Sequence, residues 1–265
     1  MYEFNYHRPA SIDEARAILE TSDEALLLAG GMTLLPTMKL RLAQPSDLVD
    51  LTAIDELGGI REEDDGVTIG AMVRHADVAS NEQVQAAIPA LADLAESIGD
   101  AQVRNRGTLG GSISNNDPAA DYPAAALALN GVIRTDRREI AADDFFLGLF
   151  ETALETNEIV QSVTFRRPQR AAYAKFPNPA SRYAIAGVLV AAFDAGVRVA
   201  VTGAGPCVFR ATALEEALSQ DFSVSALDGL QVDPADFNSD LHASPEYRAH
   251  LVLVMAARAV SEAGG

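Results

Sequence analysis

Two short glycine-rich segments constrain this chain more than any other feature of its sequence. The first, Ala-Gly-Gly-Met-Thr-Leu at residues 29–34, directly follows an apolar run, and the second, Arg-Gly-Thr-Leu-Gly-Gly-Ser-Ile at 106–113, lies in a polar region. Glycines let successive backbone N–H groups turn toward an anion and approach it closely. Either segment alone fits an ordinary tight turn, because paired glycines mark many turns. The two segments have similar compositions, and each contains a hydroxyl side chain. Together they predict two sides of one phosphate-binding site.

Two other motifs have competing interpretations. Asp121 precedes a helix whose first turn contains Pro123, so the sequence alone favours a plain N-cap, and the alternative is a carboxylate that accepts hydrogen bonds from a ribose. The Gly-Ala-Gly-Pro segment at 203–206 resembles the start of a dinucleotide fingerprint. Val208 replaces its third glycine and Pro206 lacks an amide hydrogen, so we reject that interpretation. The absence of a glycine-lysine-serine/threonine ending also argues against a P-loop nucleotide hydrolase.

Charge and cysteine content exclude several classes of protein. The chain has 38 Asp and Glu residues against 20 Lys and Arg residues, a net charge of −18, which argues against binding to nucleic acid or anionic lipid. Cys207 is the only cysteine, so an internal disulfide, a cysteine zinc site and an iron–sulfur cluster are excluded, and we expect a buried, inert thiol. The four histidines lack metal-ligand spacing. No signal sequence or membrane-spanning run is apparent, which predicts a cytoplasmic protein.

Hydrophobic periodicity and turn residues predict a mixed order of helices and strands. A capping box of Ser11 and Glu14 predicts a helix over residues 12–19. Further helices are predicted at 75–81, 89–98, 122–129, 211–220 and from Ser244-Pro245 onward, the last with Tyr247, Leu251, Val254 and Met255 on one face. Strands are predicted at 25–29 (buried), 48–51, 132–135, 158–165 and 172–176, with hairpins at 60–69 (turn at Asp65-Gly66) and 185–203. Residues 99–121 are predicted to form a long loop, and the mixed order favours the α+β class.

The glycine segments also carry a family resemblance. AGGMTLLP (29–36), RGTLGGSI (106–113) and DPAADYP (117–123) resemble the FAD-binding (medium) subunits of molybdenum hydroxylases. The likeness extends over essentially the whole chain, from residues 6–9 to 247–260. Within that family it is greatest to the medium subunit of aerobic carbon monoxide dehydrogenase, and the xanthine dehydrogenase flavin domain is more distant. The chain is therefore identified as a member of this family.

The resemblance implies a domain organisation. Residues 1–177 would form an FAD-binding domain of the PCMH/VAO type, made of two α/β subdomains at about 1–55 and 56–177. Residues 178–265 would form a smaller C-terminal α+β domain of the carbon monoxide dehydrogenase flavoprotein type, with a three-stranded antiparallel sheet and helices. A boundary near residues 177–179 (Pro-Asn-Pro) agrees with the composition of that segment. The flavin would lie between the two subdomains.

The resemblance also implies which residues hold FAD. The backbone amides of the first segment would wrap the pyrophosphate: Ala29, Gly30, Gly31, Met32, Thr33 and Leu34. Thr108, Gly110, Gly111 and Ser112 would close the other side. Two of these positions depart from the common family pattern, because the family commonly has histidine or asparagine at Met32 and asparagine at Ser112.

Four further residues follow from the resemblance. Asp121 would hold the ribose or adenosine end, and Ile159 would pack on the adenine. Lys175 and Tyr183 would lie near the isoalloxazine ring, where a positive charge stabilises reduced, anionic flavin. On sequence alone, Lys175 could equally be an ordinary cation at the end of a strand.

The implied activity is electron transfer within an oxidoreductase complex. The partners would be an iron–sulfur (small) subunit and a molybdopterin (large) subunit, and the electron acceptor would be a quinone or NAD. FAD would be the cofactor, with no metal and no catalytic side chain in this chain. A carbon monoxide dehydrogenase medium subunit is one such assignment. Two alternatives stay open: a stand-alone FAD-dependent oxidoreductase of the same fold, and a non-catalytic module that has lost FAD.

Overall fold

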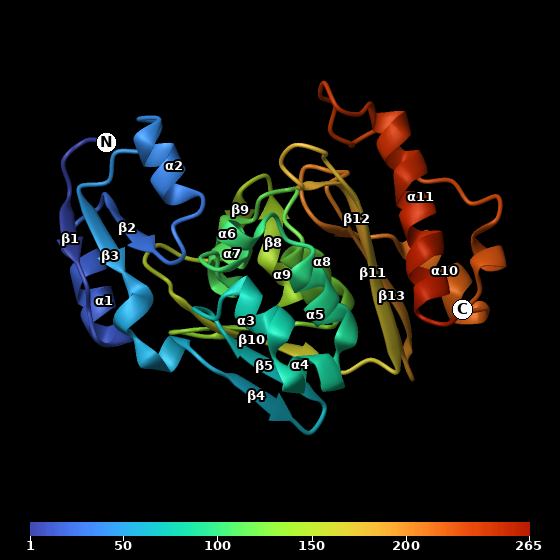
Figure 1. The fold of residues 1–265 in the computed structure, drawn as a ribbon, viewed down its shortest axis with the longest axis horizontal. Helices are drawn as coiled ribbons and strands as arrows, with labels where there is room; N and C mark the ends of the chain where they lie inside the picture. Colours follow the sequence, from blue (N-terminus) through green and yellow to red (C-terminus); the bar gives the residue numbers. More distant parts are fainter.

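A computed structural model describes all residues from 1 to 265, and its sheets divide the molecule into three units (Figure 1). The N-terminal unit, blue in Figure 1, contains a three-stranded parallel sheet with the order β1-β3-β2. Its elements are β1 (Asn5–His7), α1 (Ile12–Leu19), β2 (Ala25–Leu28), α2 (Leu34–Lys39), β3 (Asp47–Asp50), η1 (Leu51–Ala53) and η2 (Asp55–Leu57). Helix α1 begins as predicted, because Ser11 accepts a hydrogen bond from the Glu14 N–H.

Strand β2 forms where predicted, but it is less buried than expected. Leu26 is 41% exposed, and the other three residues of the strand are partly buried. The reason is that Ala25, Leu26 and Leu27 line a cavity, although Ala25 and Leu27 also pack against the core of the N-terminal unit. Because an apolar strand that faces a ligand site can have the same composition as one that faces a core, the sequence did not distinguish the two.

The middle unit is built on a five-stranded antiparallel sheet with the order β4-β5-β10-β6-β7. Its strands are β4 (Ile60–Glu63), β5 (Gly66–Gly70), β6 (Val132–Thr135), β7 (Glu139–Ala141) and β10 (Val160–Arg166), with a small hairpin of β8 (Phe146–Gly148) and β9 (Glu151–Thr152). The turn of the first hairpin is Asp64-Asp65, not the predicted Asp65-Gly66. Gly66 instead lies inside the sheet, where a Cβ would come within 2.0 Å of the Phe165 carbonyl oxygen.

Helices cover this sheet, and two of them lie in the segment predicted to be a loop. The helices of the unit are α3 (His75–Ser80), α4 (Glu82–Ala87), α5 (Pro89–Glu96), α6 (Ala101–Arg104), α7 (Leu109–Asn115), α8 (Tyr122–Ala128) and α9 (Ala142–Phe145). The prediction of an irregular segment over 99–121 was wrong at α6 and α7. Asp100 and Thr108 cap these two helices, and Leu109 and Ile113 bury the inner face of α7. In α7, tertiary burial thus outweighs the low helix propensity of glycine, serine and asparagine.

The C-terminal unit has an antiparallel sheet with the order β11-β12-β13-β14. Its elements are β11 (Arg170–Pro177), β12 (Ala184–Phe193), β13 (Gly196–Thr202), β14 (Phe209–Arg210), α10 (Thr212–Gln220), η3 (Val224–Leu227) and α11 (Pro245–Glu262). Three long strands form most of the sheet, with the two-residue β14 at its edge. Strand β11 belongs to this sheet although it precedes residue 178, and the domain boundary at 177–178 remains a prediction.

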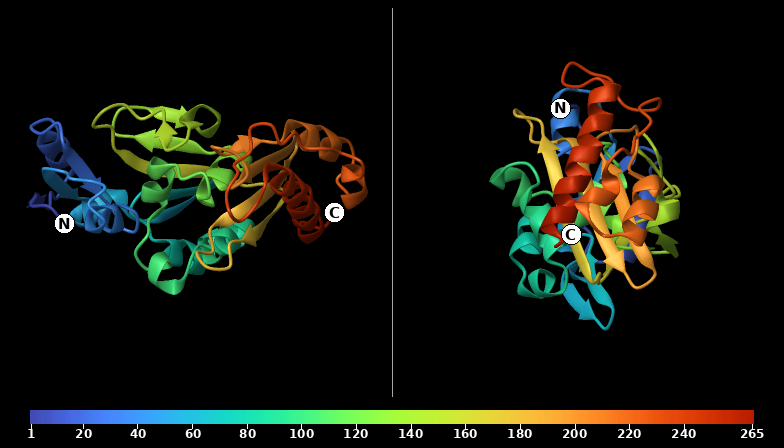
Figure 2. Two further views of the ribbon diagram at one scale, coloured as in Figure 1. Left: turned by 90° about the horizontal axis from the view of Figure 1, so that it is seen from above. Right: turned by 90° about the vertical axis from the view of Figure 1, so that its right-hand side faces the viewer.

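Helix α11 packs against β11 and β12 and lies on the outer side of the C-terminal sheet (Figures 1 and 2). Leu251 and Met255 are buried as predicted, whereas Tyr247 is 43% exposed and contacts Phe176 edge to face. None of the helices combines the length and the apolar character that a bilayer crossing requires.

One core residue joins two of these units. The core of the N-terminal unit consists of apolar residues between positions 12 and 57, together with Ile159. Ile159 directly precedes β10 of the middle unit, and it is 1% exposed. The two units therefore share a hydrophobic contact close to the predicted site.

Candidate functional site

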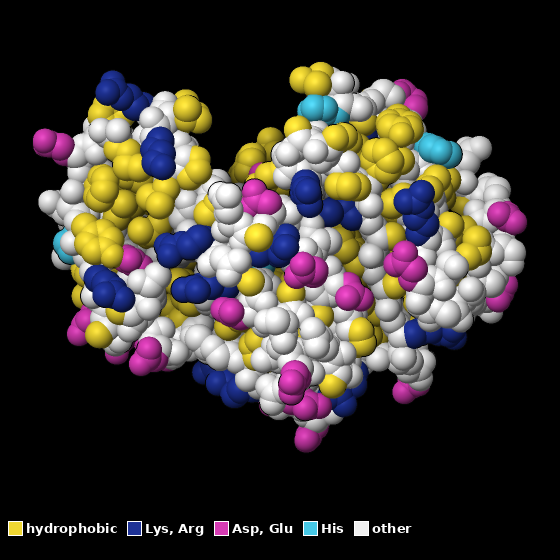
Figure 3. Space-filling view, viewed as in Figure 1, with side chains coloured by type: hydrophobic (Ala, Val, Ile, Leu, Met, Phe, Trp, Pro, Cys, Tyr) yellow, Lys and Arg dark blue, Asp and Glu magenta, His cyan; other side chains and the backbone are white.

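A cavity of about 730 Å³ lies where the N-terminal unit, the middle unit and the loop before β12 meet. It is of the size that small-molecule and cofactor sites have in proteins. Figure 3 shows a hollow between the N-terminal unit and the rest of the molecule, with hydrophobic side chains gathered beside it. Of the predicted site residues, all except Lys175 line the cavity: Ala29, Gly30, Gly31, Met32, Thr33, Leu34, Thr108, Gly110, Gly111, Ser112, Asp121, Ile159 and Tyr183.

The two glycine segments contact each other through their backbones. A Cβ on Gly30 would lie 2.1 Å from the Arg106 carbonyl oxygen and 2.8 Å from the Cα of Gly107, so only glycine permits this approach. Gly31 has a φ of +71°, a left-handed conformation that other residues rarely adopt. Two segments that are far apart in the sequence therefore form one continuous backbone surface along the cavity.

The first segment presents a run of free backbone donors. The N–H groups of residues 30–33 donate to no acceptor within the protein. Backbone donors in folded proteins normally have partners, so four consecutive free amides at a cavity indicate a place for an acceptor from outside the chain. A phosphate oxygen is such an acceptor. This arrangement fits the pyrophosphate of FAD.

The second segment contributes fewer donors than the predicted set suggested. The Gly110 N–H donates to the Ala71 carbonyl at 2.8 Å, and the Gly111 N–H donates to Thr108 Oγ1 at 3.2 Å. The Ser112 N–H likewise donates within the protein, to the Thr108 carbonyl. The groups left without a protein partner are the N–H of Thr108 and the hydroxyl of Ser112. Gly110 therefore acts through its lack of a side chain, since a Cβ there would lie 2.5 Å from that of Ala71.

Asp121 stands at the N-cap position of α8, as the sequence favoured, but it is not a plain N-cap. Its side chain makes no capping hydrogen bond to α8 and is almost fully buried. The carboxylate instead accepts a hydrogen bond from the Tyr173 hydroxyl and lies 3.0 Å from Lys175 Nζ. Burial raises the pKa of Asp121, and the nearby charge of Lys175 and the Tyr173 hydroxyl oppose this rise.

Lys175 lies behind the cavity wall. Its ammonium group contacts Asp121 and donates to the Ser97 carbonyl at 2.8 Å, and its side chain is 7% exposed. Asp121 therefore compensates the positive charge that was predicted for the flavin ring. Tyr183, by contrast, is 48% exposed and reaches the cavity from the loop between β11 and β12.

Sequence reasoning missed His75, which lines the cavity at the start of α3. The imidazole is 5% exposed and lies 5.3 Å from the Tyr122 ring, measured between ring centroids. Burial, followed by the charge of Arg104, lowers its pKa to about 4, so the ring is neutral at pH 7. The spacing of the histidines in the sequence gives no sign of this position. No group of His, Cys, Asp and Glu residues in the structure is suited to holding a metal ion.

The fold and the cavity define a flavin-binding subunit of an oxidoreductase. Residues 2–167 match the family model described as "FAD binding domain in molybdopterin dehydrogenase". The chain belongs to this family, and FAD is its cofactor.

Two relatives and one solved structure match almost the whole chain. The chain is 38% identical to the "Carbon monoxide dehydrogenase medium chain" of Hydrogenophaga pseudoflava, over 98% of this chain and 96% of the relative. It is 37% identical to the "Nicotine 6-hydroxylase medium subunit" of Paenarthrobacter nicotinovorans, again over 98% and 96%. Among solved structures, carbon monoxide dehydrogenase from Hydrogenophaga pseudoflava matches with a TM-score of 0.90 at 38% identity, covering 99% of this chain and 97% of that one.

Proposed function

We propose that this chain is the FAD-carrying electron-transfer subunit of a molybdenum hydroxylase complex. It would take electrons from an iron–sulfur subunit, which receives them from a molybdopterin subunit, and deliver them to a quinone or NAD. The observation that carries the proposal is the row of free backbone amides at residues 30–33, in a cofactor-sized cavity of a chain that belongs to this family. When bound, FAD supplies the redox chemistry, and the protein supplies position and electrostatics.

The residues around the cavity have distinct proposed roles. The amides of the first glycine segment would bind the pyrophosphate, with Thr108 and Ser112 completing the cradle from the second. Ile159 would contact the adenine, and Tyr183 would lie beside the isoalloxazine. Asp121 would face the ribose while it stays paired with Lys175. The positive charge of Lys175, balanced by Asp121, would then lie near the isoalloxazine ring. A medium chain of carbon monoxide dehydrogenase is one form of this proposal.

The relatives show why the primary substrate does not follow from this chain. Two of similar identity are named for different substrates, carbon monoxide and nicotine. The site described here contains no group that we assign to acid–base work on such a substrate. Substrate choice would therefore belong to the molybdopterin subunit, because function follows the site and not the fold.

A visible absorption spectrum tests the cofactor part of the proposal. The purified chain is incubated with FAD and desalted, and the retained flavin is released and identified. We expect stoichiometric FAD, and replacing Gly111 or Asp121 should weaken its retention. Failure to retain FAD, both alone and when co-expressed with the neighbouring subunit genes, would overturn the assignment.

Rapid mixing of the assembled complex tests the electron route. After reduction by substrate, the flavin absorbance near 450 nm should recover on mixing with either a quinone or NAD⁺, and the faster acceptor is the physiological class. Reduction of the flavin by substrate that is unchanged in a complex lacking the iron–sulfur subunit would contradict the proposed relay.

A further inference from the structure

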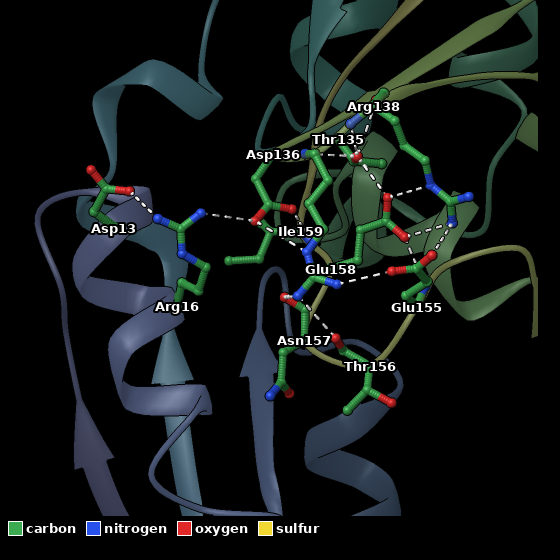
Figure 4. Close-up of polar contacts among 11 residues, drawn as sticks. Asp13, Arg16, Thr135, Asp136, Arg138, Glu155, Thr156, Asn157, Glu158 and Ile159 are labelled. Carbon is green, nitrogen blue, oxygen red and sulfur yellow. Dashed lines mark hydrogen bonds and ion pairs between the residues drawn. The ribbon is translucent and has the colours of Figure 1, made fainter.

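Asp136 places a buried carboxylate next to Ile159, which lines the cavity (Figure 4). Its side chain is 2% exposed. Oδ1 accepts a hydrogen bond from the Ile159 N–H at 2.8 Å, and the Asp136 N–H donates to the Ile159 carbonyl at 2.9 Å. Oδ2 is buried and has no hydrogen-bond partner. A buried charged oxygen without a partner is costly unless an opposite charge lies close to it.

The compensating charges come from both units. Arg137, the next residue along the chain, has its Nε 4.0 Å from Asp136 Oδ2. Arg16 lies on α1 of the N-terminal unit, and its Nη1 is 3.8 Å from the same oxygen. Figure 4 shows the Arg16 side chain reaching from α1 toward Asp136. The charge of the buried carboxylate therefore attracts the N-terminal unit onto the middle unit.

Two further contacts cross the same gap. The Asn157 side chain donates to the Leu19 carbonyl at 3.2 Å, and Ile159 packs into the core of the N-terminal unit. Leu19, Asn157 and Ile159 all line the cavity. The spacing of the two units at this point thus helps to set the width of the cavity.

The middle-unit side of this gap is held firmly. Glu158 is buried and accepts two hydrogen bonds from Arg138, at 3.0 Å each, and a third from the Glu155 N–H at 2.7 Å. The segment that carries Ile159 is therefore fixed to its own unit, and the Arg16–Asp136 contact joins this segment to α1.

We infer that Arg16 and Asp136 form a latch between the two units that positions Ile159 and sets the affinity for the adenosine half of FAD. Both act through Ile159 and the cavity width, so they are positioning residues. The inference rests on the proposed placement of the adenine at Ile159.

Titrations with three ligands test the latch in the full-length apoprotein. FAD binding is followed by flavin fluorescence, with ADP and FMN as competing probes for the two halves of the dinucleotide. Arg16 is 37% exposed, so Arg16→Gln should fold normally. Asp136→Asn keeps an oxygen that can accept from Ile159, and it removes the charge by replacing the second oxygen with an NH₂ group.

We expect each single variant to weaken FAD and ADP by about fivefold to tenfold, and the double variant to weaken them no further. FMN affinity should stay unchanged. Asp13→Asn is the matched control, because Asp13 is Arg16's other partner at 2.7 Å and is 84% exposed. It should leave all three affinities at the wild-type values.

Each failure has its own pattern. Wild-type affinities for FAD and ADP in both single variants, or an additive double variant, would overturn the latch. Weaker FMN binding with ADP unchanged would overturn the adenosine assignment. A wild-type chain that binds no FAD would instead overturn the proposed function.

Discussion

Lys175 Nζ lies 3.0 Å from Oδ1 of Asp121, and the two side chains are 7% and 5% exposed. Lys175 belongs to β11 of the C-terminal sheet, whereas Asp121 directly precedes α8 of the middle unit. The Tyr173 hydroxyl donates to the same carboxylate oxygen. This buried ion pair joins two units of the molecule immediately behind the cofactor cavity.

Breaking this ion pair should strongly destabilise the fold. Lys175→Met leaves the Asp121 carboxylate buried without its cation, which costs about 3–5 kcal/mol. Urea denaturation should show this loss, and a double variant with Asp121→Asn should recover part of it. Lys39→Met, at the only other lysine, is exposed and should change the free energy of unfolding by less than about 0.5 kcal/mol. Equal stabilities of the two lysine variants would contradict the importance of the pair.

Gly30→Ala should separate the two glycine segments. The added Cβ would meet the Arg106 carbonyl oxygen at 2.1 Å, and backbone atoms cannot move aside cheaply. We expect a loss of about 1–3 kcal/mol in stability and little retained FAD after desalting. Gly205→Ala is the control, since its Cβ would be 3.4 Å from the nearest atom. FAD retention by Gly30→Ala at the wild-type level would contradict the packing argument.

His75 should make stability pH-dependent just below neutrality. Its folded-state pKa of about 4 lies below the unfolded value of 6.5, so the native state favours the neutral ring. Stability is therefore complete above about pH 6.5 and falls as the pH drops toward 4, by at most about 3 kcal/mol. His75→Phe should flatten urea denaturation midpoints over this range, and His250→Asn, at an exposed position, should not. A parallel pH dependence in wild type and His75→Phe would refute this prediction.

Glu158 should contribute to stability in a more acidic window. The hydrogen bonds from Arg138, above all, lower its pKa from 4.5 to about 2. Because the folded-state pKa is lower than the unfolded one, this stabilisation is present above pH 4.5 and is lost between 4.5 and 2. Its upper limit is about 3 kcal/mol. Glu158→Gln should remove this part of the acid denaturation curve, whereas Glu155→Gln, 60% exposed on its side chain, should keep it.

Asn116 should hold the β8–β9 hairpin to the end of α7. Its side chain donates to the carbonyls of Gly148 and Glu151, at 2.9 and 2.8 Å, and its φ is 43°. Asn116→Ala loses both hydrogen bonds and adds backbone strain, about 2–4 kcal/mol in all, whereas Asn116→Gly loses only the hydrogen bonds. Limited proteolysis near Phe150 should be fastest in the alanine variant, intermediate in the glycine variant and slowest in wild type.

Local patterns predicted much of the secondary structure. The capping box at Ser11 and the apolar periodicity after it identified α1, and the two apolar runs around the turn at 194–196 identified the β12–β13 hairpin over 185–203. These elements depend on hydrogen bonds and side chains close together in the sequence. Helix α7 was missed because burial of Leu109 and Ile113 by distant residues stabilises it, whereas the four-residue α6 has no buried residue and begins at the Asp100 cap.

By itself, the sequence determined the two glycine segments, the mixed α+β order and the residues that the family resemblance places around FAD. Only the tertiary structure decided which of these groups remain free to bind. It left the amides of residues 30–33 without partners, bound the Gly110 amide to Ala71, and paired Asp121 with Lys175. The physical reason is that a hydrogen bond or an ion pair depends on atoms brought within about 3 Å by the whole fold, and residue order alone does not specify that distance.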